Sequence, residues 1–102
     1  MNRLQNKVAI VTGANSGIGL RTAQLFAEEG AILVLCARRK EKLDEVAEAL
    51  RAQGSQVLSI AADVSREEDC VRVVEEAVKA FGRVDVLVNN AGMADKHRPI
   101  TR

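Results

Sequence analysis

The chain has 102 residues, a formal net charge of +1 and 47% hydrophobic residues, a composition typical of one globular domain. The balanced charge gives no electrostatic argument for binding nucleic acid or a membrane surface. The longest apolar run, residues 31–37, is too short to span a membrane, and the polar N-terminus lacks the pattern of a signal peptide. We therefore expect a cytoplasmic protein.

The first predicted strand, residues 8–11, leads directly into the glycine-rich sequence T-G-A-N-S-G-I-G at residues 12–19. A turn from strand into helix leaves backbone N–H groups unpaired at the positive end of the helix dipole, where phosphate binds. Gly13 permits the tight turn, Gly17 lets a ligand approach, and Gly19 lets the helix pack on the strand. The alternative, an ordinary turn, leaves these glycines without a reason. The candidate phosphate-binding residues are Gly13, Asn15, Ser16, Gly17, Ile18 and Gly19.

The first helix is expected over about residues 16–29 and the second strand over residues 32–37. The predicted inward face of this helix consists of Ile18, Thr22, Leu25 and Phe26. The second strand is followed by Arg38, Arg39 and Lys40, with no carboxylate before position 41. Cations at the start of a helix are unfavourable unless an anion is bound, and the forked guanidinium of Arg38 suits a phosphate. The alternative is a solvated basic helix end.

The second helix is expected over about residues 39–53, and a third strand follows at residues 57–61. The residues predicted to face inward from this helix are Leu43, Val46, Ala47 and Leu50. Ser65 and Glu68 form a predicted capping box at the start of a third helix, which extends to residue 81. Its predicted inward residues are Cys70, Val73, Val74, Ala77, Val78 and Phe81.

A fourth strand is expected at residues 84–88, followed by a polar, aperiodic segment at residues 93–102. All four strands are predominantly apolar, non-alternating runs rich in Val, Ile and Leu, which is typical of parallel strands covered on both faces. Strands and helices alternate along the chain, so right-handed crossovers give a parallel α/β sheet.

Metal and disulfide sites are not expected. Cys36 and Cys70 both fall at apolar positions, which favours free, buried thiols. His97 is the only histidine and has no Cys or His at ligand spacing.

Three motifs of this chain resemble those of the short-chain dehydrogenase/reductase family. They are T-G-A-N-S-G-I-G at residues 12–19, Asp63-Val64 after the third strand, and Asn89-Asn90-Ala91-Gly92 after the fourth. They occur in the family's order and near its spacing, which is far more specific than one glycine motif. The resemblance implies a Rossmann-type parallel sheet that binds a nicotinamide dinucleotide over residues 1–92.

The resemblance also assigns cofactor contacts. A basic residue at the Arg38 position, here followed by Arg39, marks the members that prefer NADP, whereas an acidic residue in this region marks NAD. The resemblance further implies that Asp63 accepts a hydrogen bond from the adenine amino group and that Val64 packs on the adenine ring. The alternative is that Asp63 helps Ser65 to cap the next helix. The residues implied to lie against the cofactor ribose are Asn90, Ala91 and Gly92. Asn89 and Asn90 are also expected to tie adjacent strand ends together.

The family's catalytic Ser, Tyr-x-x-x-Lys and Asn would follow residue 102, and the chain contains no tyrosine. We therefore expect no catalytic residue here and no activity of the chain alone, with residues 93–102 leading to a missing catalytic half. The full-length parent is expected to transfer hydride between NADP(H) and a carbonyl or secondary alcohol. The alternatives are a non-catalytic nucleotide-binding module and a non-functional gene remnant. In the family's strand order, 3-2-1-4-5-6-7, truncation after the fourth strand exposes a sheet edge, a surface for self-association.

Overall fold

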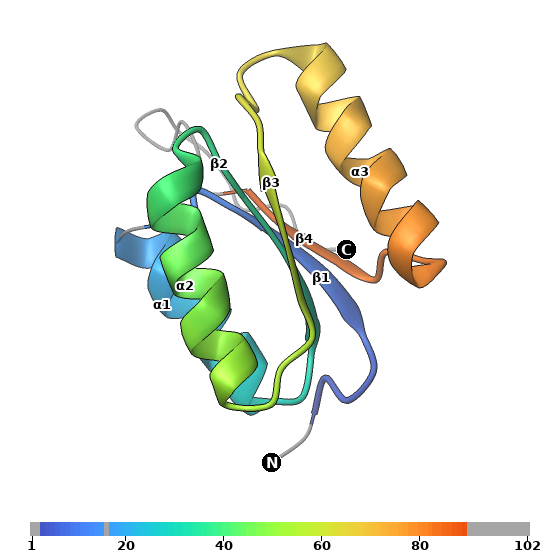
Figure 1. Cartoon of the computed structure of the whole chain (residues 1–102). Coiled ribbons are helices and arrows are strands. Elements are labelled where there is room, and N and C mark those ends of the chain that lie inside the picture. Colours follow the sequence, from blue (N-terminus) through green and yellow to red (C-terminus); the bar gives the residue numbers. More distant parts are fainter. Residues whose placement is uncertain (1–2, 16, 90–102) are drawn as a thin grey trace.

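The computed structural model describes residues 3–15 and 17–89, which form a parallel four-stranded sheet with helices on both faces (Figure 1). The strands are β1 (Val8–Thr12), β2 (Ile32–Ala37), β3 (Val57–Ala61) and β4 (Val86–Val88). The helices are α1 (Gly17–Glu28), α2 (Lys40–Ala52) and α3 (Glu67–Phe81). The sheet order is β3-β2-β1-β4, so the predicted Rossmann-type α/β fold is confirmed, with β4 at an edge of the described sheet.

Alternate residues of each strand enter two separate cores. Leu33 and Leu35 of β2 pack on the α1–α2 side, whereas Val34 and Cys36 pack on the α3 side. All four of these side chains are fully buried, so both faces of the strand are covered along residues 33–36. This two-sided burial explains why the strands are continuous apolar runs instead of alternating ones.

The strand register brings three loops to one edge of the sheet. Thr12 at the end of β1 pairs with Cys36, which in turn pairs with Ile60 of β3. Because all these strands are parallel, the segments that follow them emerge side by side. The glycine-rich loop, the basic run and the Asp63 segment are thus neighbours in space.

The predicted inward faces of α1 and α3 are partly wrong. The structure buries Gly19 and Ala23 of α1, whereas Ile18 is 67% exposed and Leu25 is 43% exposed. Small residues at a spacing of four let α1 approach the sheet closely, and the larger side chains then flank the contact. In α3, Val73 and Ala77 are buried as predicted, but Val74 and Val78 are exposed. In α2, the prediction is confirmed: Leu43, Ala47 and Leu50 are buried and Val46 packs against the core.

The predicted capping box and the start of the fourth strand also need correction. Helix α3 begins at Glu67, one residue later than the box requires, and its N-cap residue Arg66 makes no side-chain capping bond. The Ser65 hydroxyl instead donates to the Asp63 carboxylate. Strand β4 begins at Val86, two residues after the predicted start at position 84.

Asp85 fastens the start of β4 to β1. Its backbone N–H donates to the Val8 carbonyl oxygen at 2.8 Å, and its carboxylate accepts from the Val8 N–H at 2.9 Å. The Arg83 guanidinium also donates to both oxygens of this carboxylate. The Arg83 and Val8 bonds hold the pKa of Asp85 below its ordinary value of 3.8.

Acid should therefore weaken the fold in part through Asp85. A carboxyl group whose pKa is lowered by folding contributes stability above its unfolded pKa, and that stability is lost as pH falls through the folded pKa. The variant Asp85→Asn should be less stable than the original chain at neutral pH and should lose less stability below pH 3.8. Urea unfolding across this pH range measures both effects. Glu48→Gln is the control, because Glu48 is exposed and its carboxylate pairs with Arg51 at 3.4 Å. An equal acid response in both variants would contradict the assignment.

Candidate functional site

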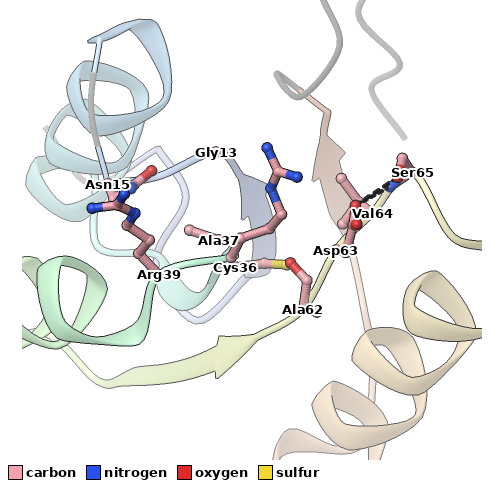
Figure 2. Close-up of a pocket in the computed structure, with 10 residues that line it drawn as sticks. Gly13, Asn15, Cys36, Ala37, Arg39, Ala62, Asp63, Val64 and Ser65 are labelled. Atoms are coloured by element: carbon pink, nitrogen blue, oxygen red, sulfur yellow. Dashed lines mark hydrogen bonds between the residues drawn. The ribbon is translucent and has the colours of Figure 1, made fainter.

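A cavity of about 650 Å³ lies at the edge of the sheet where β1, β2 and β3 end (Figure 2). Its walls come from three segments that are far apart in the sequence. The lining residues are Gly13, Asn15, Cys36, Ala37, Arg38, Arg39, Ala62, Asp63, Val64 and Ser65. A hollow beyond the carboxyl ends of parallel strands is the usual ligand site of an open α/β sheet.

The glycine-rich loop is pinned to the end of β2. The backbone N–H groups of Gly13 and Ala14 donate to the Cys36 carbonyl oxygen at 2.8 and 3.3 Å. Gly17, the first residue of α1, has a φ of +60°, and a Cβ atom added there would meet nothing within 4 Å. The start of α1 therefore combines a backbone conformation that favours glycine with open space beside it, which suits the close approach of a ligand.

Gly19 has the opposite surroundings. It is buried, and a Cβ atom added there would overlap the Gly13 carbonyl group and approach the Thr12 carbonyl oxygen to 3.1 Å. These atoms belong to the backbone of the loop, so they cannot move away without moving the loop. Gly19 thus sets how closely α1 packs against the turn that follows β1.

Two of the three cations after β2 line the cavity. Arg38 and Arg39 are exposed and belong to its wall. The Lys40 ammonium instead donates to both carboxylate oxygens of Asp44, one helical turn along α2, at 3.0 and 3.2 Å. The positive charge of the cavity therefore comes from two guanidinium groups, which can bind a phosphate through paired hydrogen bonds.

The segment after β3 presents a fixed carboxylate. One oxygen of Asp63 accepts from the Ser65 N–H at 3.0 Å and from the Ser65 hydroxyl at 2.6 Å (Figure 2). These two bonds, with smaller contributions from the positive charges of Arg38 and Arg66, hold the pKa of Asp63 below its ordinary value of 3.8. Asp63 is therefore an ionised hydrogen-bond acceptor at neutral pH.

Asn89 joins the ends of β1 and β4. The hydroxyl of Thr12, which is buried, donates to the Asn89 side-chain oxygen at 2.9 Å. This contact agrees with the expectation that the amide of Asn89 ties strand ends together. Four predicted site residues lie outside the described residues: Ser16, Asn90, Ala91 and Gly92.

The structure brings most of the described candidates into one cavity wall. Those in the wall are Gly13, Asn15, Arg38, Arg39, Asp63 and Val64. Gly17, Ile18 and Gly19 do not line it. Sequence reasoning missed Ser65 as a wall residue, although an Asp followed two positions later by Ser is a recognisable local turn. It also missed Cys36, Ala37 and Ala62, which adjoin the strand ends and carry no chemical signal of their own.

The two cysteines are free, and burial raises the pKa of Cys36 to about 11, so its thiol is protonated at neutral pH. Cys36 is buried as predicted, whereas Cys70 is only partly buried. Within residues 3–15 and 17–89, no cluster of His, Cys, Asp and Glu could hold a metal ion. None of the described helices has the length and apolar character needed to cross a membrane.

Comparison with known proteins identifies the family. Residues 7–101 match the family described as short chain dehydrogenase, and the chain therefore belongs to the short-chain dehydrogenase/reductase family of oxidoreductases. The 11-beta-hydroxysteroid dehydrogenase 1A of Arabidopsis thaliana is 53% identical over 91 residues, which are 88% of this chain and 26% of that protein. The A-factor type gamma-butyrolactone 1'-reductase (1S-forming) of Streptomyces virginiae is 49% identical over 86 residues, 84% of this chain and 34% of that protein.

Solved structures share the fold. L-Sorbose reductase from Gluconobacter frateurii, complexed with NADPH and L-sorbose, has a TM-score of 0.87 and 44% identity, covering 96% of this chain and 38% of the other. A short-chain dehydrogenase/reductase from Burkholderia phymatum in complex with NAD has a TM-score of 0.81 and 36% identity, covering 85% of this chain and 31% of the other. The chain thus spans well under half the length of the proteins it matches.

Proposed function

We propose that this chain is the cofactor-binding part of an NADP(H)-dependent short-chain oxidoreductase, with the binding unit in residues 1–92. The observation that carries the proposal is a single cavity that combines a glycine-rich loop, two arginines and a fixed carboxylate. The NADPH in the related L-sorbose reductase supports the cofactor class. The NAD in the Burkholderia relative makes NAD the competing choice.

Each part of the cavity has chemistry that suits one part of NADP(H). We assign the 2′-phosphate to Arg38 and Arg39, since two guanidinium groups follow β2 and no carboxylate comes before position 41. We assign the pyrophosphate to the loop residues Gly13, Asn15, Ser16, Gly17, Ile18 and Gly19. The adenine is assigned to Asp63 and Val64, and the cofactor ribose to Asn90, Ala91 and Gly92.

The bound nicotinamide would supply or accept hydride, and the residues of this chain would bind and orient the adenosine half. For the whole protein we propose hydride transfer between NADP(H) and a carbonyl or secondary alcohol. The relatives named as a hydroxysteroid dehydrogenase, a lactone reductase and a sugar reductase support this reaction class. The chain contains no tyrosine, so we propose that these 102 residues alone do not catalyse the reaction.

Calorimetric titration with four nucleotides tests the proposal. NADP⁺ and adenosine 2′,5′-bisphosphate should bind, because both carry the 2′-phosphate and the adenine that the cavity is proposed to hold. NAD⁺ and adenosine 5′-monophosphate should bind at least tenfold more weakly, which corresponds to about 1.4 kcal/mol. Equal affinity for the two dinucleotides would overturn the NADP preference, and no binding of any nucleotide would overturn the cofactor role.

A further inference from the structure

The Asp63 carboxylate accepts two hydrogen bonds from its own segment. Both hydrogen bonds from Ser65 reach the same oxygen, Oδ1, one from the backbone N–H and one from the hydroxyl. The backbone N–H of Asp63 donates in turn to the Asp69 carboxylate in the first turn of α3, at 2.7 Å. The end of β3 is thereby tied to the start of α3, and the carboxylate has one fixed orientation.

The second oxygen of this carboxylate remains available. Among the described residues, Asp63 Oδ2 has no hydrogen-bond partner, and Asp63 and Ser65 both line the cavity. The charged groups around it are Arg38 after β2, Arg66 at the start of α3, and Asp69 in that helix. An ionised carboxylate only accepts hydrogen bonds, so this oxygen suits a ligand that donates one.

We propose that Ser65 is a positioning residue for base recognition: it fixes Asp63 so that the free oxygen accepts from the exocyclic amino group of adenine. This inference rests on the proposed function. Hypoxanthine carries a carbonyl oxygen where adenine carries the amino group, so it would place an acceptor against an acceptor. Without the Ser65 hydroxyl, the carboxylate loses its shorter bond and is free to turn toward Arg38 or Arg66.

Ser65 also shapes the turn before α3, so its loss has a structural consequence that must be separated from base recognition. A structural effect weakens the binding of every nucleotide by the same factor. A positioning effect changes the ratio between two nucleotides that differ only in the base. The ratio of dissociation constants for NADP⁺ and its hypoxanthine analogue is therefore the decisive quantity.

The experiment measures this ratio for the original chain and for Ser65→Ala, Ser65→Thr and Ser59→Ala. The original chain should prefer adenine by roughly 10- to 100-fold, as expected for a hydrogen bond to a charged group. Ser65→Ala should lower the preference by roughly three- to tenfold, and Ser65→Thr should restore it because threonine keeps the hydroxyl. Ser59→Ala is the matched control, because its hydroxyl donates to the Asp44 carboxylate at 2.8 Å outside the cavity wall.

The pH dependence of NADP⁺ binding gives a second readout. Since the Ser65 bonds lower the pKa of Asp63, their partial loss in Ser65→Ala should raise that pKa. The acid loss of NADP⁺ affinity should then occur at a higher pH in Ser65→Ala than in the original chain.

Three outcomes overturn the inference: an unchanged base preference in Ser65→Ala, failure of Ser65→Thr to restore it, or an equal loss in Ser59→Ala. The outcomes that would overturn the proposed function differ from these three. If the original chain binds no nucleotide, both proposals fall. If it binds NAD⁺ as well as NADP⁺, only the 2′-phosphate assignment falls, and NAD⁺ with its hypoxanthine analogue tests Ser65 in the same way.

Discussion

A variant with Arg38→Leu should bind NADP⁺ roughly 10- to 100-fold more weakly and NAD⁺ with nearly unchanged affinity. Arg38 is exposed on the cavity wall directly after β2, where its guanidinium can form charge-assisted bonds to a 2′-phosphate. Bonds of this kind contribute about 1.5–3 kcal/mol, which gives the stated range. Calorimetric titration of both dinucleotides measures the ratio.

Lys40→Met is the matched control for this prediction. Lys40 carries the same charge two positions further along the chain, but it pairs with Asp44 at 3.0 Å and does not line the cavity. Its removal should change the NADP⁺ affinity by less than about threefold, since exposed ion pairs contribute little. An equal loss of NADP⁺ affinity in both variants would mean that the affinity depends on the net positive charge of the chain and not on a phosphate bound by Arg38.

The substitution Gly19→Ala should abolish the nucleotide binding of the original chain. It should also lower the free energy of unfolding by roughly 1–3 kcal/mol. The added methyl group would overlap the Gly13 carbonyl group, which is backbone. To remove this overlap, α1 must move away from the sheet, or the loop must break the hydrogen bond from the Gly13 N–H to the Cys36 carbonyl oxygen. Either movement changes the phosphate-binding geometry. Urea unfolding and NADP⁺ titration of the same sample measure the two effects.

Gly82→Ala separates this effect from the general cost of replacing a glycine. Gly82 ends α3 with a φ of +85°, and an added Cβ atom would meet nothing within 4 Å. This variant should lose roughly 1–2 kcal/mol from backbone strain and should keep its nucleotide affinity. If Gly19→Ala binds NADP⁺ as well as Gly82→Ala does, the close contact of α1 with the loop is not required for binding.

The sequence predicted the fold well because its strands carry a strong local signal. Runs such as residues 32–37 are apolar throughout, and a glycine follows the helix on either side, so the order of elements and the parallel sheet can be predicted. Helix faces were harder to predict. In α1 the periodic large residues Ile18 and Leu25 indicated one face, but Gly19 and Ala23 make the close contact, because small residues decide how near a helix can approach.

The candidate site was predicted where a motif has its own chemistry and missed where only geometry places a residue. Arg38 and Asp63 were identifiable from charge at a strand end, and both line the cavity. Lys40 could not be distinguished from its arginine neighbours, since its pairing with Asp44 depends on side-chain direction along α2. The sequence predicts a capping role for Ser65, but a hydroxyl before a helix has two possible partners, and in the structure it donates to Asp63.

Assigned amide NMR spectra recorded during an NADP⁺ titration show directly whether the nucleotide binds where β1, β2 and β3 end. We expect the largest shifts at Gly13, Arg38 and Asp63, which belong to the three loops that meet at one edge of the sheet. The internal reference is a second hollow of about 340 Å³ between α1 and α2, lined by residues that include Glu28 and Gln53, where no shift is expected. Shifts confined to that hollow, or no shift at any NADP⁺ concentration, would contradict a nucleotide site at the ends of β1, β2 and β3.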